Sequence, residues 1–178
     1  GAPDQRAMTW YAGIDSGSWN TKAVVIDADA RVLGSAVARS GADLTAAAER
    51  VYAEALSRAG LTPGDVSAVW ATGFGRNSVS FAQGSRTELD CHGRGAAFYV
   101  QGPLVVIDIG GQDAKVIRLS HSGGVQKFAM NDRCAAGTGK FLEIMARALE
   151  LSIDDFARTA LDANRSVTLN SLCTVFAE

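Results

Sequence analysis

One short motif occurs twice in the sequence, and this repeat constrains the fold more than any other feature. Both copies read Ile-Asp-x-Gly, followed after four residues by Lys; the first spans Ile14–Lys22 and the second Ile107–Lys115. Each copy lies at the turn between two apolar runs, which predicts a β-hairpin. An internal repeat indicates a repeated structural unit, so the sequence predicts two similar half-domains.

The residue types of the repeat also indicate a chemistry. Glycines allow backbone N–H groups to approach phosphate oxygens closely. An aspartate at the end of a strand, here Asp15 or Asp108, can hold Mg2+ directly or through water. Two such hairpins facing each other would bind a polyphosphate from both sides. The alternative, two ordinary Asp/Gly turns, is less favoured because both copies share one spacing and a following lysine.

The apolar runs predict a mixed α/β chain. Strands are expected at residues 10–15, 21–26, 31–38, 66–72, 104–109, 115–119 and 125–130. Helices are expected at residues 44–59, 88–100, from 138 to about 151, and 153–163. The best linker is Gln101–Pro103, so the expected lobes are residues 9–102 and 103–178. Residues 1–8 are typical of a disordered terminus or a cloning remnant.

A second candidate site lies where the last strand meets a helix. Cys134 is followed by the small-residue loop 135–139 and then by an amphipathic helix that Thr138 is expected to cap. The early amides of this helix are expected to point back toward the cysteine. A helix N-terminus lowers the pKa of a nearby thiol, so this place suits a phosphate or a thiolate-bound metal centre. The alternative is a buried structural cysteine beside a flexible loop.

Composition excludes several classes of protein. The 178 residues are 47% hydrophobic, which suffices for a substantial core, and the net charge of −2 favours neither nucleic acid nor an acidic membrane surface. No apolar run is long enough to span a bilayer. Three cysteines, an odd number without a Cys-x-x-Cys pair, argue against a disulfide framework and a local zinc ribbon. We therefore expect a cytoplasmic protein without nucleic-acid or membrane partners.

Several motifs together resemble a known family. The two hairpins are similar to the phosphate loops of the actin, sugar-kinase and heat-shock-chaperone ATPases. Within that superfamily, ATGFGR, ELDCHGRGA, IDIGGQDAKVI, NDRCAAGTGKFLE and SLCTVFAE resemble the activator ATPases of 2-hydroxyacyl-CoA dehydratases and the ATPase subunits of benzoyl-CoA reductases. The resemblance implies a ribonuclease-H-like α/β fold in two similar lobes with ATP between them. The family continues beyond CTVFAE, so the second lobe is expected to be incomplete.

The same resemblance implies a redox function. A dimer, formed with a second copy or a close paralogue, would share one four-iron, four-sulfur cluster, and the matching ligands are Cys134 and Cys173. Cys91 is left over and is expected to be structural or to line a pocket. A reduced ferredoxin or flavodoxin would supply the electron. ATP hydrolysis would then drive its delivery to a 2-hydroxyacyl-CoA dehydratase or a benzoyl-CoA reductase component.

Roles in the ATPase step follow from residue chemistry. Asp15 and Asp108 are the candidates for Mg2+ and its water network, and Gln112 or Asp113 would orient the attacking water. Lys22 or Lys115 would neutralise phosphate charge, or would only flank a strand. Phosphate contacts are expected from Ser16, Gly17, Ser18, Gly110, Gly111 and Gln112. Further nucleotide contacts are possible from Gly137, Thr138, Gly139 and Lys140.

Two departures from the family pattern leave alternatives open. Trp19 and Asn20 stand where the family has small residues, so the indole would either crowd the phosphate or face outward. The early end of the chain removes the family's adenosine-binding loop. A kinase-like phosphotransferase acting on a sugar or an acid, and a non-catalytic fragment of the same fold, are the competing functions.

Overall fold

The computed structural model describes residues 9–168 and divides the chain into two compact units. The first extends to His92 and the second begins at Gly93. The division falls within helix α2 (Glu88–Tyr99), before the linker at which the sequence places the boundary between lobes. In residues 9–168 no helix is long and apolar enough to cross a membrane.

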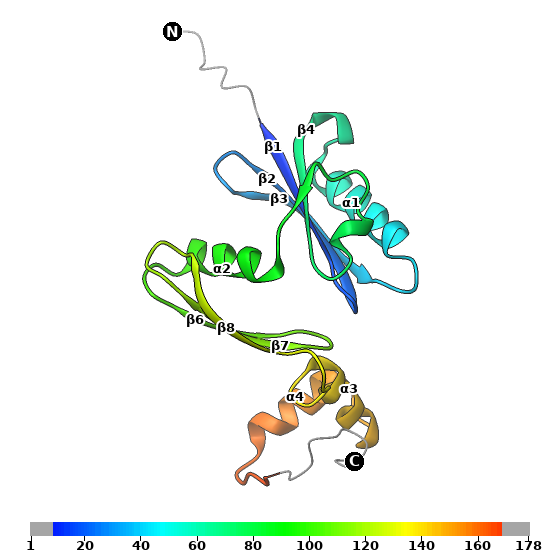
Figure 1. Cartoon of the computed structure of the whole chain (residues 1–178). Coiled ribbons are helices and arrows are strands. Elements are labelled where there is room, and N and C mark those ends of the chain that lie inside the picture. Colours follow the sequence, from blue (N-terminus) through cyan, green and yellow to red (C-terminus); the bar gives the residue numbers. More distant parts are fainter. Residues whose placement is uncertain (1–8, 169–178) are drawn as a thin grey trace. The chain divides into compact units, whose positions relative to one another are not determined.

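The first unit is built on a mixed five-stranded sheet (Figure 1). Its strands are β1 (Trp10–Ser16), β2 (Asn20–Asp27), β3 (Val32–Arg39), β4 (Val66–Thr72) and β5 (Gly84–Ser85), in the order β3-β2-β1-β4-β5. The first three strands form an antiparallel meander, and β4 and β5 run parallel to β1. The carboxyl ends of β1 and β4 therefore lie side by side.

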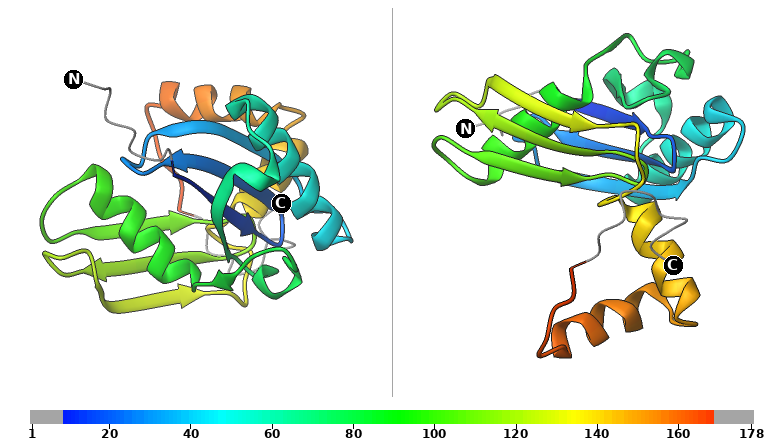
Figure 2. Two further views of the ribbon diagram at one scale, coloured as in Figure 1. Left: turned by 90° about the horizontal axis from the view of Figure 1, so that it is seen from above. Right: turned by 60° about the horizontal axis from the view of Figure 1, so that its bottom comes forward.

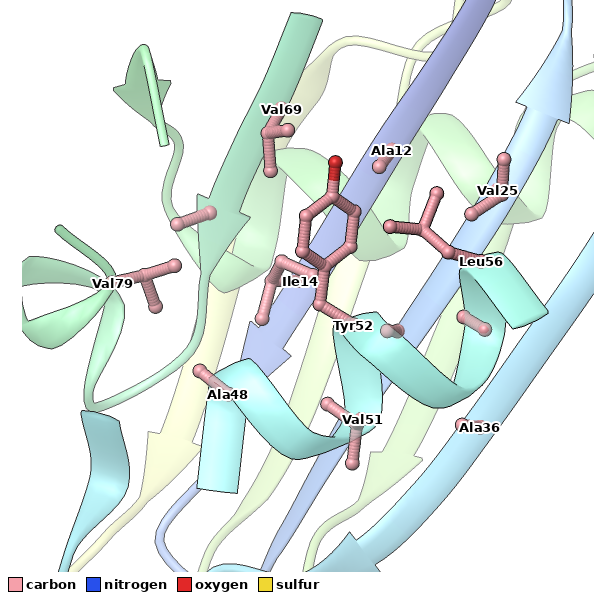
Figure 3. Close-up of a cluster of buried hydrophobic side chains, with 13 residues drawn as sticks. Ala12, Ile14, Val25, Ala36, Ala48, Val51, Tyr52, Leu56, Val69 and Val79 are labelled. Carbon is pink, nitrogen blue, oxygen red and sulfur yellow. The ribbon is translucent and has the colours of Figure 1, made fainter. Parts of the chain in front are cut away.

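Helix α1 (Leu44–Ala59) covers one face of this sheet. Asp43 caps its start by accepting a hydrogen bond from the Ala46 amide, and Gly60 ends it in the left-handed conformation. Gly34 of β3 allows the close approach of the helix, since a Cβ there would collide with the Ala55 carbonyl oxygen. Figure 3 shows the resulting core, in which the ring of Tyr52 lies between α1 and the strands.

A short 3-10 turn, η1 (Pro63–Asp65), leads from α1 into β4. The Asp65 carboxylate accepts hydrogen bonds from the Thr62 amide at 2.8 Å and the Thr62 hydroxyl at 2.7 Å. These bonds hold the pKa of Asp65 below its usual value, because they favour the charged form.

The second unit repeats the meander. Strands β6 (Val105–Ile109), β7 (Ala114–Leu119) and β8 (Val125–Asn131) form an antiparallel sheet in the order β6-β7-β8. Helix α2 lies across one face of this sheet (Figure 2), where Gly93 allows close contact with Leu119. Helices α3 (Gly139–Ala148) and α4 (Ile153–Asp162) follow, and Ser152 caps α4 as the sequence predicts.

The repeat places equivalent residues on equivalent faces, but those faces differ in exposure. In the first unit Ala12, Ile14 and Ala23 lie under α1 and are at most 4% exposed. Their counterparts in the second unit, Val105, Ile107 and Val116, are 65%, 71% and 44% exposed. The second sheet thus presents an apolar face that, among the described residues, has no counterpart of α1 packed on it.

The predicted strands and helices are confirmed to within one or two residues at most ends. The sequence analysis missed β5 and the two 3-10 turns, which are too short to show a period. The sequence patterns also did not indicate which helix packs on which sheet.

Candidate functional site

The first repeat forms a β1–β2 hairpin with an ion pair at its open end. Asp15 and Lys22 are directly opposite in the antiparallel register, and the Lys22 ammonium lies 2.7 Å from Asp15 Oδ2. The pair is partly exposed, at 24% for Asp15 and 52% for Lys22. The spacing of the motif therefore sets a cross-strand pair, which the sequence analysis did not foresee.

The turn of this hairpin is held by buried hydroxyl groups. The Ser40 hydroxyl donates to the Gly17 carbonyl at 2.6 Å and lies 2.8 Å from the Thr21 hydroxyl. Arg39 stacks over the Trp19 ring at 4.5 Å, beside this turn. The predicted phosphate contacts Ser16, Gly17 and Ser18 thus belong to one ordered turn.

A loop from β4 packs against the end of β1. The Gly75 amide donates to the Ser16 carbonyl at 2.7 Å. Gly73 has a φ of 91°, and a Cβ there would lie 2.5 Å from Asp15 Oδ1. Both positions therefore require glycine. The sequence marks this loop as ATGFGR, but only the parallel pairing of β1 with β4 brings it to Asp15.

Two hydroxyl groups at this place have no hydrogen-bond partner within residues 9–168. They belong to Ser16, which is fully buried, and to Thr72, the β4 residue opposite Asp15. Buried hydroxyls are normally paired, so unpaired ones at a strand end mark a place where a ligand or water can bind.

A cavity of about 470 Å³ opens beside the same strand ends on the sheet face opposite α1. Asp15, Lys22 and Thr72 line it together with Cys91 and His92 of α2. Most of the remaining lining is apolar and comes from β2, β3 and β4. The cavity joins the Asp15–Lys22 pair to an apolar surface large enough for part of a small molecule.

The second repeat forms the equivalent hairpin, but its charges are arranged differently. Asp108 and Lys115 are again opposite in register. The Lys115 ammonium, only 2% exposed, lies 2.8 Å from Asp113 Oδ2 and 3.4 Å from Asp108 Oδ2. This lysine bridges two carboxylates within the unit, whereas Lys22 contacts one and faces solvent.

Asp113 also closes the turn through its backbone. Its carbonyl oxygen accepts a hydrogen bond from the Gly110 amide at 2.8 Å, and a Cβ at Gly110 would collide with Asp113 Oδ1. Gly17 and Asn20 have the same spacing in the first turn, where a Cβ at Gly17 would lie 2.6 Å from the Asn20 carbonyl oxygen. The repeat therefore extends to an Asx residue that the sequence analysis did not include.

The start of helix α3 is bonded to this second turn. The Gly139 amide donates to the Gly110 carbonyl and the Lys140 amide to the Gly111 carbonyl, both at 2.9 Å. The expectation that these amides point toward the cysteine is therefore wrong. Thr138 occupies the capping position, but its hydroxyl donates to the Ala135 carbonyl at 2.5 Å and accepts no helix amide, so the predicted side-chain cap is also wrong.

Cys134 lies in a loop folded around Asn131. The Asn131 side chain accepts from the Cys134 amide at 3.3 Å and donates to the Cys134 carbonyl at 3.0 Å. The Ala136 amide lies 3.5 Å from the Cys134 sulfur. The loop thus presents a partly buried thiol that a backbone amide faces, the kind of contact made to thiolate ligands.

The remaining predicted site residues are Gly137, Gln112 and Cys173. Gly137 lies in this loop at a φ of 75°, and Gln112 lies at the second turn, between Gly111 and Asp113. Cys173 lies outside the described residues. Within residues 9–168, no three His, Cys, Asp or Glu side chains group as a metal site, and neither Cys91 nor Cys134 forms a disulfide.

Comparisons with known proteins show the family. The family model described as the BadF/BadG/BcrA/BcrD ATPase family matches residues 12–178. The activator of lactoyl-CoA dehydratase from Anaerotignum propionicum is 43% identical over 166 residues, which cover 93% of this chain and 64% of that protein. A subunit of benzoyl-CoA reductase from Thauera aromatica is 33% identical over 175 residues, covering 96% and 62%. The chain therefore spans less than two thirds of the length of these relatives.

Solved structures show the same fold. The activator of the 2-hydroxyisocaproyl-CoA dehydratase from Clostridium difficile, with bound ADPNP, superimposes with a TM-score of 0.88 at 37% identity, covering 95% of this chain and 63% of that one. MreB 5 of Spiroplasma citri, bound to AMPPNP, reaches a TM-score of 0.50 at 12% identity, covering 92% and 65%, and shares the fold alone. The fold is therefore the expected α/β fold of the actin-like ATPases.

Proposed function

Because the chain belongs to the BadF/BadG/BcrA/BcrD ATPase family, we propose that it binds and hydrolyses ATP with Mg2+ and couples hydrolysis to the delivery of a low-potential electron. The observation that carries this proposal is the bonding of the second phosphate turn to the helix that follows Cys134. One short segment thereby joins the candidate nucleotide site to the candidate redox site.

The two hairpin turns supply the nucleotide site. Ser16, Gly17 and Ser18 on one side and Gly110 and Gly111 on the other contact the phosphates through backbone amides, since glycine-containing turns allow close approach. Asp15 and Asp108 hold Mg2+ through its water shell. Each carboxylate is bound to a lysine through one oxygen, an arrangement that suits water-mediated rather than direct coordination.

Of the two candidates for orienting the attacking water, the geometry favours Gln112. Asp113 is already bound to Lys115 and closes the turn with its carbonyl oxygen. An amide side chain can both donate to and accept from a water molecule, as this role requires. Lys115 accordingly shapes the turn rather than contacting phosphate, and Lys22 balances the charge of Asp15.

Movement at the second turn would reach Cys134 through a short path. The Gly110 and Gly111 carbonyls hold the first amides of α3, and Thr138 holds the Ala135 carbonyl next to the cysteine. Closure of the turn on a phosphate would therefore shift the start of α3 and the cysteine loop together. Gly137, Thr138 and Gly139 take part as the hinge of this path.

Cys134 and Cys173 would each supply a thiolate to a four-iron, four-sulfur cluster, with two more thiolates from a second copy or a close paralogue. Such a cluster, when bound, accepts and donates one electron at a potential that its surroundings set. The Ala136 amide facing the Cys134 sulfur fits this assignment.

The electron donor and acceptor follow from chemistry and from the relatives. A reduced ferredoxin or flavodoxin fits a low-potential one-electron step. The acceptor is a 2-hydroxyacyl-CoA dehydratase or a benzoyl-CoA reductase, because one relative is named as an activator of a dehydratase and another as part of a benzoyl-CoA reductase.

Nucleotide chemistry is tested by MgATP binding and phosphate release. We expect Asp15→Asn and Asp108→Asn each to lower the rate of phosphate release at least tenfold, since each removes a charge that positions Mg2+. Asp29→Asn, in the exposed β2–β3 turn, is the matched control and should retain the rate. Phosphate transfer to a small molecule instead of water would favour the kinase-like alternative.

The cluster is tested by oxygen-free reconstitution with iron and sulfide. Iron and sulfide should bind together, and Cys134→Ser should abolish both while Cys91→Ser leaves them intact. Equal loss with the two variants, or iron retained by Cys134→Ser, would contradict the assignment.

A further inference from the structure

The proposed function gives no role to the turn from Thr72 to Arg76 in the first unit. We propose that this turn is a third element of the nucleotide-phosphate site and that Arg76 is its phosphate-binding cation. The inference rests on the proposed ATP binding and adds to it a residue outside the two repeats. It follows from the charges, the packing and the unpaired hydroxyls at the end of β1.

Both lysines of the repeats are paired with carboxylates. Lys115 is 2% exposed and bridges two carboxylates, and Lys22 lies 2.7 Å from Asp15. Each lysine is thus offset by at least one aspartate. A nucleotide polyphosphate keeps negative charge beyond what one Mg2+ neutralises, so a cation that no carboxylate offsets would strengthen its binding.

Arg76 has the required charge and is held in place. Its Nη1 donates to the Gly73 carbonyl at 3.1 Å, which fixes the guanidinium beside the turn and leaves further N–H donors for a ligand. No ion pair joins Arg76 to a carboxylate anywhere in the described part of the chain. By contrast, Arg39 and Arg86 stack on Trp19 and Trp70.

The turn also reaches the Asp15 carboxylate. Gly75 donates to the Ser16 carbonyl, and any side chain at Gly73 would collide with Asp15 Oδ1. A Cβ at Gly75 would lie 2.5 Å from the Ser16 hydroxyl. Gly73 therefore leaves the Asp15 carboxylate without a side chain packed over it, whereas Gly75 lies directly against the buried Ser16 hydroxyl.

The unpaired hydroxyls of Ser16 and Thr72 are the independent sign of a ligand. Both lie at the carboxyl ends of adjacent parallel strands, where open α/β sheets bind their ligands. A buried hydroxyl without a partner is costly, and a phosphate oxygen or an ordered water would supply the missing bond after a side-chain rotation. The turn thus places Arg76 and two unsatisfied hydroxyls at the end of β1, with Thr72 on the same sheet face as Asp15 and Ser16 beneath Gly75.

The test compares Arg76→Gln, Arg76→Lys and the control Arg31→Gln, which removes the same charge from the exposed β2–β3 turn. Dissociation constants for MgATP are measured by calorimetry at low and high salt, together with thermal midpoints. We expect Arg76→Gln to weaken MgATP binding about tenfold or more at low salt and to reduce the salt dependence of binding. Arg76→Lys should retain only part of the affinity, because lysine keeps the positive charge but lacks the planar fork of the guanidinium.

Three outcomes overturn the inference. If Arg76→Gln binds MgATP as Arg31→Gln does, Arg76 is no phosphate ligand, although the proposed function stands. If its affinity falls with an unchanged salt dependence and a lowered thermal midpoint, the role of Arg76 is structural. If the unsubstituted protein neither binds MgATP nor releases phosphate, the proposed function fails and the inference fails with it.

Discussion

At the scale of single residues, the two lysines of the repeat have different environments although their sequence positions are equivalent. Lys22 is half exposed beside one aspartate, whereas Lys115 is buried between two. A charge pair in solvent contributes little to stability, but removing one partner of a buried group leaves uncompensated charge. The two hairpins therefore share one strand register, but the burial of each lysine determines how much its ion pairs contribute to stability.

Lys115→Met should consequently destabilise the protein much more than Lys22→Met. We expect a loss of about 2 kcal/mol in the free energy of unfolding for Lys115→Met, which is reduced from the value for a fully buried pair because both aspartates are partly exposed. Lys22→Met should cost less than about 0.5 kcal/mol. Urea denaturation measures both, and equal losses would contradict the different environments.

Asp65 gives a prediction that depends on pH. Its folded-state pKa lies below the usual value, so it stabilises the fold above the unfolded-state pKa, and the contribution is lost as the pH falls through the folded-state pKa. Asp65→Asn should therefore lower the thermal midpoint at neutral pH and have less effect at an acidic pH below the folded-state pKa, where the Asp65 carboxylate is protonated. An equal effect at both pH values would show that the carboxylate charge is not involved.

At the scale of elements, two glycines predict opposite effects for the same substitution. A Cβ at Gly34 would collide with a backbone oxygen of α1, whereas a Cβ at Gly95 in α2 would meet nothing within 4 Å. Gly34→Ala should destabilise by about 3 kcal/mol by displacing α1. Gly95→Ala should stabilise by about 0.5–1 kcal/mol through helix propensity. Thermal unfolding of the two variants distinguishes them from each other.

The cysteine loop makes a prediction about reactivity. Asn131 holds the loop through bonds to the backbone on both sides of Cys134. Asn131→Ala should therefore increase the rate of Cys134 alkylation several-fold, measured in a Cys91→Ser, Cys173→Ser background without iron. Asn77→Ala, in the 3-10 turn η2 (Arg76–Ser78), serves as the control and should leave the rate unchanged. An unchanged rate in Asn131→Ala would show that these bonds do not order the thiol.

At the scale of the whole molecule, both hairpins should respond to one nucleotide. Amide hydrogen exchange with and without MgATP should show protection at residues 15–22 and 108–115 together, because the proposed function assigns phosphate contacts to both turns. Protection of only one hairpin would mean that one copy of the repeat is structural.

Local sequence patterns predicted most elements but not the contacts between distant segments. The spacing of Asp15 and Lys22 indicates a hairpin, because register and turn length are local properties. By contrast, the contact of Gly73 with Asp15 depends on the parallel pairing of β1 with β4, and the bonds from Gly139 to Gly110 depend on the path of the chain after β8. The early amides of α3 were assigned to the cysteine because sequence proximity was the only distance available.

The exposed apolar face of the second sheet has a practical consequence for all of these measurements. Val105, Ile107 and Ile109 alternate along β6, which is an edge strand with no partner on its outer side among the described residues. Exposed edges of this kind associate from molecule to molecule. Solutions concentrated enough for calorimetry will therefore scatter light as aggregates form. A charge introduced at Ile107 would keep the protein dispersed without altering either hairpin turn.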